Sequence, residues 1–429
     1  MSVRLMLVLM LLLLATDVWA QTALDYVNAP DDSYAWECMG EEVLPSGATM
    51  VGLKVTSQTW QGTVWTHRVQ LIVPEEMTHP ETALMLITGG TAGERELLFL
   101  GTIANAVGAP VAVLGDIPNQ PLFDGLNEDA LIALTFAKYL ETGDATWPLL
   151  FPMAKAAVRA MDAIEEFTAE GWDTPVTSFV TTGASKRGWT TWFTGAIVPD
   201  RLKGIAPMVY DNLNMPAQMK HQVEAWGDYS EQICDYTERG LPDLLSTSVG
   251  ITLGGIVDPY TMRRVITMPK LTITGTNDEY WPLDAADLYF DNMRGPNYIV
   301  YVPNSGHGLQ DLVRVINAET GFFLGCTGRA PLPKLTWDFV MGRYLKLRVK
   351  SDIEPARVTQ WTAHSDTRDF RKATWAERDA IARDGEWLCR LLRPESGYAA
   401  IFGEVTYEVD GRDFPLSTGV RIIAARESD

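Results

Sequence analysis

Histidine, cysteine and basic residues are scarce in this chain of 429 residues, which contains five histidines and four cysteines. The histidines and cysteines form no cluster at the spacing that zinc ligands need, so we expect neither a metal site nor a cofactor. The 35 basic residues are outnumbered by 55 acidic residues, which gives a formal net charge of -20. Such a surface repels nucleic acid and anionic membranes, so we expect neither as a partner.

Long apolar runs are also missing after the first twenty residues, so no later segment is expected to span a membrane. Residues 1–20, MSVRLMLVLMLLLLATDVWA, contain one arginine, an apolar run of about ten residues and a Val-Trp-Ala ending. This pattern predicts a secretory signal peptide that is cut near Ala20, and therefore a secreted or periplasmic protein. An uncleaved anchor is the alternative, but the run is shorter than the roughly 20 residues that a bilayer requires.

An even number of cysteines in an exported chain favours one or two disulfides, because such bridges persist in oxidising compartments. The four residues are Cys38, Cys234, Cys326 and Cys389. Their spacing does not choose among the three possible pairings.

Short strands and helices alternate through the middle of the chain. Two β-rich runs, 48–60 and 64–74, flank Gln61-Gly62-Thr63 and predict a hairpin. Continuous apolar runs that end in glycine, such as ALMLITGG at 83–90, are typical of strands buried on both faces of a parallel sheet. The other expected strands are 109–116, 174–183, 204–210, 270–275 and 297–303, and the expected helices are 127–143, 148–171, 186–196 and 284–293. This alternation predicts an α/β sheet with helices on both faces, which is the α/β-hydrolase architecture.

Two regions depart from this alternation. Residues 211–268 are rich in aromatic residues and fall where hydrolases of this fold commonly carry a cap, so we expect a helical and aromatic cap there; a surface insertion without a role in binding is the alternative. Residues 331–429 predict a small C-terminal β-sandwich, interrupted by a charged stretch at 374–387 that could be helical. The predicted domains are therefore a signal peptide (1–20), an α/β-hydrolase domain with its cap (21–330) and the β-sandwich.

Three residues could form a nucleophilic triad. A serine hydroxyl becomes a good nucleophile when an imidazole takes its proton and a carboxylate holds the other ring nitrogen. In α/β hydrolases these groups follow strands in the order Ser, then Asp or Glu, then His. Ser185 follows the strand SFVTTG, Asp278 follows KLTITG, and His307 follows the last apolar strand. Singly, each residue would also fit a helix cap or a loop, but their joint order and context predict a catalytic triad.

The remaining histidines do not satisfy this order. His67 and His79 precede the core of the sheet, His221 lies in the insertion before Asp278, and His364 lies in the C-terminal region. His307 is therefore the only histidine at the expected place.

The turn at Ser185 departs from the usual hydrolase motif, because the second position after the serine is Arg187. Small residues are needed there since the strand and the helix approach closely. Gly183 meets this need before the serine, and Gly188 could relieve the contact one residue late. We therefore interpret the turn as a variant nucleophile elbow in which Arg187 points away from the sheet.

Negative charge on a tetrahedral intermediate must be met by hydrogen-bond donors. The backbone N–H of Lys186 is one expected donor, and the second is expected from the loop after ALMLITGG, at Gly90 or Thr91. The side chains of Lys186 and Arg187 could add positive charge near the oxyanion or near a substrate carboxylate. Alternatively, these two side chains face solvent.

Several long segments resemble the PhoPQ-activated pathogenicity-related protein family, which includes autocrine proliferation repressor-like proteins. The segments that carry the resemblance are GASKRGWTTW, ETGDATWPLLFPMAKAAVRAMD, DPYTMRRVITMPKLTITGTNDEYW and FPLSTGVR. The resemblance spans nearly the whole mature chain. It implies an exported protein with an α/β-hydrolase domain similar to peptidases of the prolyl oligopeptidase and dipeptidyl peptidase type, and it supplies no substrate.

Two local similarities bear on the site. The pattern Gly275-x-x-Asp278-x-x-Trp281-Pro282 looks like the loop that carries the catalytic aspartate in prolyl oligopeptidase-like enzymes. The spacing Gly-x-Ser-Lys-x-Gly is similar to the elbow of glucuronoyl esterases, where a basic residue directly after the serine supports the oxyanion. By that similarity, Lys186 could contribute through its side chain as well as its backbone.

The sequence thus predicts a secreted serine hydrolase, peptidase-like or carbohydrate-esterase-like, that acts on a small-molecule or peptide substrate through an acyl-enzyme. The alternative is a non-catalytic exported signalling or virulence factor that keeps the hydrolase fold as a binding scaffold, because fold does not imply function. Ser185 is essential under the first hypothesis and dispensable under the second.

Overall fold

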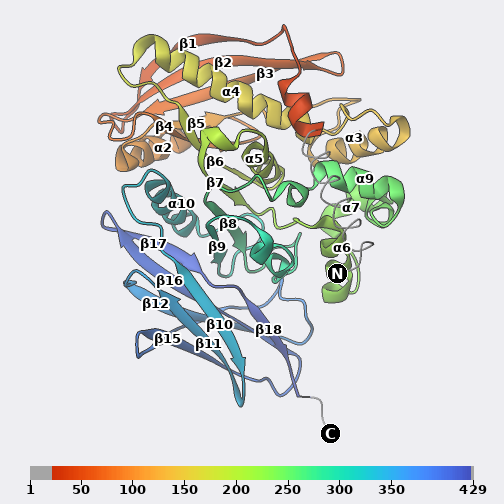
Figure 1. Ribbon diagram of the computed structural model, residues 1–429, viewed down its shortest axis with the longest axis vertical. Coiled ribbons are helices and arrows are strands. Elements are labelled where there is room, and N and C mark those ends of the chain that lie inside the picture. Colours follow the sequence, from red (N-terminus) through yellow and green to blue (C-terminus); the bar gives the residue numbers. More distant parts are fainter. Residues whose placement is uncertain (1–21, 427–429) are drawn as a thin grey trace, which may run out of the picture.

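A computed structural model describes residues 22–426 of the chain, and the predicted signal peptide lies outside this range. Nine strands form the N-terminal part of its main sheet: β1 (Ala35–Val43), β2 (Thr49–Trp60), β3 (Thr63–Val73), β4 (Thr82–Ile87), β5 (Val111–Leu114), β6 (Ser178–Ala184), β7 (Leu202–Met208), β8 (Lys270–Gly275) and β9 (Asn297–Val302). Their order across the sheet is β1-β2-β3-β5-β4-β6-β7-β8-β9. Figure 1 shows this sheet running down through the molecule.

The first three strands are antiparallel to their neighbours. The six strands β4 to β9 run parallel to one another. The predicted hairpin is confirmed: β2 pairs with β3 around Gln61 and Gly62, whose φ angles of 47° and 77° suit a tight turn. The parallel strands are buried on both faces, as the continuous apolar runs predicted; every residue of β8 is buried. The chain therefore has the predicted α/β-hydrolase architecture.

Helices cover both faces of the parallel strands. On one face lie α4 (Leu150–Gly171) and α5 (Lys186–Ile197), and on the other lie α2 (Glu94–Val107) and α10 (Leu312–Cys326). The helix α3 (Glu128–Thr142) packs beside the insertion that follows β7. Two large apolar clusters, one on each face of the sheet, form the core.

The insertion at 211–268 consists of short helices beside the carboxyl ends of the parallel strands (Figure 1). They are α6 (Met215–Trp226), η2 (Glu231–Ile233), α7 (Cys234–Thr237), α8 (Leu241–Leu244), α9 (Ser248–Val257) and η3 (Pro259–Met262). We call this insertion the cap. In the cap, α7 and α9 contact α3. The cap therefore packs against a helix of the hydrolase domain.

The C-terminal part forms two antiparallel layers. One is a four-stranded sheet in the order β10-β11-β15-β14, made of β10 (Leu335–Met341), β11 (Tyr344–Ser351), β15 (Glu386–Leu392) and β14 (Ile381–Arg383). The other contains β12 (Arg357–Ser365), β13 (Ala376–Asp379), β16 (Tyr398–Val409), β17 (Arg412–Ser417) and β18 (Arg421–Ala424). This second layer continues the main sheet, because β17 pairs with β9 through Ser417 and Ile299.

Two expected helices are wrong. The charged stretch 374–387 forms β13, β14 and the start of β15, and the turn between the last two uses Asp384 and Gly385, both at positive φ. The segment 284–293 forms two 3₁₀ turns, η4 (Ala285–Leu288) and η5 (Phe290–Asn292), instead of one helix. Between them, Tyr289 adopts φ -143° and its side chain is fully buried, which interrupts the helical path.

The expected disulfides are also wrong. All four cysteines lie within the described residues and are free, because they belong to β1, α7, α10 and β15, which lie in different parts of the molecule. Burial raises the pKa of the Cys389 thiol to about 12. Across residues 22–426, no helix combines the length and the apolar composition needed to cross a bilayer.

Candidate active site

Ser185 occupies the sharp turn between β6 and α5. Its φ and ψ are 58° and -126°, a strained conformation for a residue with a side chain. Its N–H donates to the carbonyl oxygen of Met208 at the end of β7, and its own carbonyl oxygen accepts from Trp189 in the first turn of α5. The neighbouring strand and helix therefore hold the serine in the geometry of a nucleophile elbow.

Glycines on both sides of the elbow allow the close approach that this turn requires. A Cβ on Gly183 would lie 2.8 Å from the carbonyl oxygen of Arg187, and a Cβ on Gly188 would lie 2.6 Å from the carbonyl oxygen of Met208. Gly188 thus allows the close approach that the glycine two residues after the serine allows in the usual motif. The close approach that the sequence predicts at this turn is present, and its role in catalysis stays a prediction.

The structure brings the three predicted triad residues together. His307 Nε2 lies 3.0 Å from Ser185 Oγ, and His307 Nδ1 lies 3.0 and 3.1 Å from the two carboxylate oxygens of Asp278. The Asp278 side chain is only 2% exposed. Its Oδ1 also accepts a 2.8 Å hydrogen bond from the backbone N–H of Tyr280, whose ring stacks on the His307 imidazole with centroids 4.0 Å apart. These contacts fix the tautomer that presents a bare Nε2 to the serine hydroxyl.

A segment of the C-terminal part braces the loops that carry Asp278 and the histidine. The Nδ2 atom of Asn277 donates to three backbone carbonyl oxygens within 370–373, at 2.7 to 3.2 Å. Asn304, in the histidine loop, exchanges hydrogen bonds of 2.7 and 3.0 Å with the backbone of Trp375. The two loops are therefore held by one segment distant in sequence, 370–375, which we call the brace.

Both basic side chains after the serine are paired with carboxylates and only 8% and 12% exposed, so the alternative that they face solvent is wrong. Arg187 donates to both carboxylate oxygens of Glu128 at 2.7 Å and to the carbonyl oxygen of Ile117 at 2.6 Å. Lys186 Nζ lies 2.9 Å from Glu128 and 3.1 Å from Asp129. Burial would raise the Glu128 pKa, but the hydrogen bonds from Arg187 and Lys186 lower it to about 2.

The predicted oxyanion donors lie on adjacent elements. Lys186 begins α5 directly after the serine, and the loop with Gly90 and Thr91 follows β4, whose last residue Ile87 pairs with Gly183. The Gly90 carbonyl oxygen packs against Gly115, where a Cβ would lie 2.8 Å away. The roles of these backbone groups stay predictions.

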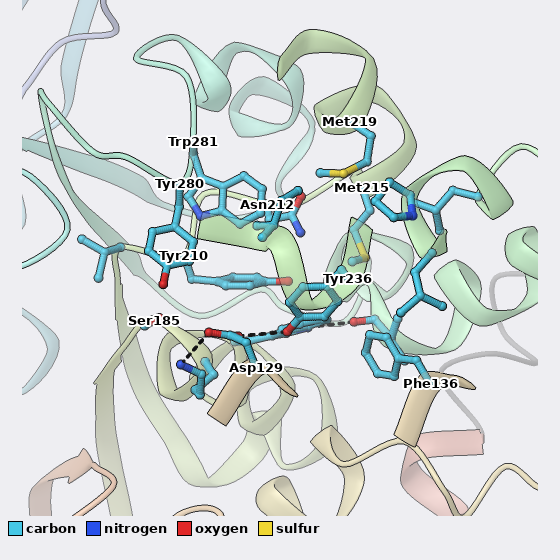
Figure 2. Close-up of a pocket in the computed structure, with 18 of the residues that line it drawn as sticks. Asp129, Phe136, Ser185, Tyr210, Asn212, Met215, Met219, Tyr236, Tyr280 and Trp281 are labelled. Carbon is cyan, nitrogen blue, oxygen red and sulfur yellow. Dashed lines mark hydrogen bonds and ion pairs between the residues drawn. The ribbon is translucent and has the colours of Figure 1, made fainter. Parts of the chain in front are cut away.

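A pocket opens from Ser185 and His307 and extends beneath the cap. It encloses about 740 Å³ of space, including the part open to solvent. Figure 2 shows Ser185 at one side of this pocket and Met215 and Met219 of α6 at the other. Its walls are largely aromatic and aliphatic. Among the lining residues that sequence reasoning did not single out are Asp129, Phe136, Trp189, Tyr210, Asn212 and Tyr280.

Two other histidines form pairs that do not qualify as catalytic. Ser57 Oγ lies 2.9 Å from His67 Nε2, but both side chains are fully buried, and burial lowers the pKa of His67 to about 4. His221 Nε2 lies 2.7 Å from Asp284, which also pairs with Arg368 from the C-terminal part. Asp284 thus links His221 of the cap to Arg368 of the C-terminal part.

Comparison with known proteins places the chain among related sequences. Residues 23–371 match the model of a family described as "PhoPQ-activated pathogenicity-related protein". The chain is 32% identical over 448 residues to autocrine proliferation repressor protein A of Dictyostelium discoideum, covering 94% of this chain and 89% of that protein.

Similar solved structures share less sequence. An acetyl xylan esterase from Paenibacillus sp. R4 has a TM-score of 0.49 and 14% identity, covering 70% of this chain and 93% of that chain. An S-formylglutathione hydrolase from Agrobacterium tumefaciens has a TM-score of 0.46 and 12% identity, covering 68% of this chain and 99% of that chain.

Proposed function

The chain belongs to the PhoPQ-activated pathogenicity-related protein family, and from that premise and the geometry around Ser185 we propose that it is a secreted serine hydrolase. The observation that carries the proposal is the 3.0 Å contact between Ser185 Oγ and His307 Nε2, with Asp278 on the other ring nitrogen. The strained elbow supports it, because such strain is typical of functional turns. The substrate is a carboxylic ester or an amide that reaches the serine through the capped pocket.

The reaction proceeds through an acyl-enzyme. His307 Nε2 takes the proton of the Ser185 hydroxyl as Oγ attacks the substrate carbonyl carbon. Asp278 holds the imidazole and stabilises its protonated form. The backbone N–H of Lys186 and one from Gly90 or Thr91 stabilise the oxyanion. The leaving alcohol or amine then takes the proton from His307, and a water molecule activated by the same histidine hydrolyses the acyl-enzyme.

The direct test is covalent labelling with a fluorophosphonate probe, because such probes react readily with an activated serine and not with an ordinary one. We expect labelling of the native protein near neutral pH and none of the Ser185→Ala variant. Ser57→Ala is a matched control, since Ser57 also contacts a histidine but is fully buried; it should retain labelling. Absence of labelling in the native folded protein contradicts the proposal.

A second candidate function is that of a signalling factor, which the name of the relative in Dictyostelium discoideum favours. Under this alternative, the hydrolase fold serves as a scaffold and Ser185 is idle. An assay on cells whose proliferation the native protein represses distinguishes the two functions. Repression by folded Ser185→Ala protein supports the scaffold, and loss of repression supports catalysis.

Secretion is the remaining part of the proposal and depends on residues 1–20, MSVRLMLVLMLLLLATDVWA. The protein exported by its host should begin near Gln21, as N-terminal sequencing can show. Retention of full-length protein inside the cell contradicts this part without bearing on the hydrolase chemistry.

A further inference from the structure

Arg187 reaches from the nucleophile elbow to the loop that follows β4. A Cβ on Gly89, in that loop, would lie 2.3 Å from Nη2 of Arg187 and 2.9 Å from its Cζ. The guanidinium therefore lies directly against the backbone of Gly89. The arginine that stands where the usual elbow has a small residue thus contacts the loop from which the second oxyanion donor is expected.

Three hydrogen bonds hold the guanidinium in this position. Nη1 and Nη2 of Arg187 each donate to one carboxylate oxygen of Glu128 at 2.7 Å, and Nε donates to the carbonyl oxygen of Ile117. Two parallel bonds to one carboxylate define the plane of the guanidinium as well as its distance. Lysine has no such fork and could not make the same set of contacts. The end of this long side chain is therefore a rigid surface against which Gly89 packs.

Glu128 is anchored in turn. It is the first residue of α3, and its backbone N–H donates to Oε1 of Gln120 at 2.8 Å. Nε2 of Gln120 donates to Oε1 of the Glu128 carboxylate, and Lys186 Nζ lies 2.9 Å from the other carboxylate oxygen. The carboxylate therefore keeps its position, and so does the guanidinium that it binds.

The loop after β4 also rests on the segment that follows β5. The backbone N–H of Thr88 donates to the carbonyl oxygen of Leu114 at 2.9 Å, and its carbonyl oxygen accepts from the N–H of Ile117 at 3.1 Å. Because Nε of Arg187 donates to the carbonyl oxygen of Ile117, the arginine supports the loop through this segment as well as by direct contact. Gly90 is the next residue after the direct contact, so the direction of its N–H depends on it.

Building on the proposed function, we propose that Arg187 is a positioning residue for the oxyanion hole. It sets the distance between the loop after β4 and the nucleophile elbow, so that the N–H of Gly90 or Thr91 meets the oxyanion that forms at Ser185. Such donors are effective because they are already in place when the negative charge develops. Arg187 does not line the pocket, so it acts through Gly89 and not on the substrate.

The variants Arg187→Lys and Gly89→Ala test the proposal in hydrolysis of para-nitrophenyl butyrate. The first removes the fork, and the second places a methyl group where the guanidinium lies. Loss of one oxyanion donor costs about 10²–10³-fold in kcat, and these variants displace a donor without removing it, so we expect kcat to fall about 10- to 100-fold with KM nearly unchanged.

Arg201→Lys is the matched control for the arginine substitution. Arg201 pairs with Asp162 and Glu165 of α4, at 2.8 and 3.0 Å, and is likewise partly buried. Its replacement removes a comparable set of ion pairs away from the loop and should keep the native kcat. Thermal unfolding of every variant verifies that it folds. An equal decrease of kcat in the control would contradict a specific role of Arg187.

A double-mutant cycle shows whether Arg187 acts through Gly89. If it does, Gly89→Ala has already displaced the loop, and adding Arg187→Lys should reduce kcat by much less than it does in the native protein. Factors that simply multiply would overturn the proposal, because the arginine would then act on another part of the site.

Two further measurements do not depend on the ester and separate this proposal from the proposed function. The rate of labelling by the fluorophosphonate probe should fall in Arg187→Lys about as much as kcat, because the phosphoryl oxygen uses the same donors. Hydrogen exchange measured by mass spectrometry should be faster at the amides of residues 88–92 in this variant and unchanged in Arg201→Lys.

The outcomes for the two proposals differ. A native protein that hydrolyses the ester and is labelled, with unchanged rates in Arg187→Lys, overturns the positioning role and leaves the hydrolase function intact. A native protein that is folded but inert, with faster exchange of residues 88–92 in the variant, refutes the catalytic function and supports the tie between the arginine and the loop.

Discussion

The hydroxyl of Tyr236, in the cap, donates a 3.0 Å hydrogen bond to Asp129 at the start of α3. The other carboxylate oxygen of Asp129 lies 3.1 Å from Nζ of Lys186, the residue directly after Ser185. The cap is therefore tied to the nucleophile elbow through a single carboxylate, and small changes in the cap can reach the elbow without a contact to the substrate.

Replacing Tyr236 with Phe should loosen the cap. Loss of one hydrogen bond to a charged group costs about 1.5–3 kcal/mol, so we expect KM to rise about 10-fold and amides of α7 to exchange faster. Steady-state kinetics and hydrogen exchange by mass spectrometry measure the two effects. Tyr229→Phe is the control, because Tyr229 donates to Asp243 within the cap itself. Equal effects of the two substitutions would contradict a specific tie through Asp129.

Asp278→Asn should leave the site assembled but inactive. An amide at this position favours the wrong imidazole tautomer and no longer stabilises the imidazolium, so kcat should fall about 10⁴-fold with little change in KM. Ester hydrolysis under single-turnover conditions, with enzyme in excess over ester, measures the slow rate of this variant. A decrease of less than about 10-fold would mean that another group orients His307.

Gly188→Ala should destabilise the protein, because the new Cβ would lie 2.6 Å from the backbone oxygen of Met208. We expect a loss of about 1–3 kcal/mol in the free energy of unfolding. Gly254→Ala is the matched helical control, since the nearest atom to its Cβ is the flexible end of Leu245 at 3.4 Å. That variant should be neutral or more stable by up to about 1 kcal/mol, the helix propensity gained. Urea denaturation measures both, and equal stabilities would contradict the close approach at the elbow.

Asp211 should make stability depend on pH. Burial, and then the charge of nearby Asp278, raises the Asp211 pKa from 3.8 to about 7. Between these values the unfolded carboxyl is ionised while the folded one stays protonated, so stability falls as pH rises from about 4 to 7 and the loss levels off above 7.

Asp211→Asn removes this penalty. The variant should match the native protein near pH 4 and exceed its free energy of unfolding by up to about 4 kcal/mol at pH 8. Urea denaturation across this pH range measures the difference, with the exposed Asp200→Asn as control. A difference that does not grow with pH would show that Asp211 is ionised in the folded protein.

Asn277→Ala should impair catalysis by releasing the loop of Asp278 from the brace. It removes hydrogen bonds to three carbonyl oxygens, so we expect kcat to fall about 10-fold through misorientation of the carboxylate, with KM nearly unchanged. Asn105→Ala removes a similar side-chain bond to Ser46 far from the site in sequence and should keep the native kcat. Unchanged kcat in the first variant would mean that the brace is not needed for catalysis.

The arrangement of Ser185, Asp278 and His307 could be predicted because each follows a buried strand whose apolar pattern is local, and parallel strands bring their carboxyl ends to one edge. The role of Gly188 could also be predicted, because the close approach of strand and helix at the elbow requires a small residue. The sequence pattern was therefore sufficient to place a residue wherever its position depends on the adjacent residues or on the neighbouring strand.

Contacts between distant segments could not be predicted in this way. Glu128 precedes its partner Arg187 by 59 residues, and nothing local distinguishes Glu128 from other acidic residues at a helix start. The hairpin at Asp384-Gly385 was missed although Asp-Gly is a strong turn signal, because the charged stretch around it was interpreted as a possible helix. The disulfides were expected from the number of cysteines, which carries no information on distance.

The brace makes the geometry of the site depend on a late part of the chain. Ser185, Asp278 and His307 have all been synthesised well before residues 370–375, yet the loops of the last two are fastened by that later segment. A chain that ends before residue 370 thus carries Ser185, Asp278 and His307 without the contacts that hold two of their loops. Under the proposed function, we expect such a chain to be a poor hydrolase.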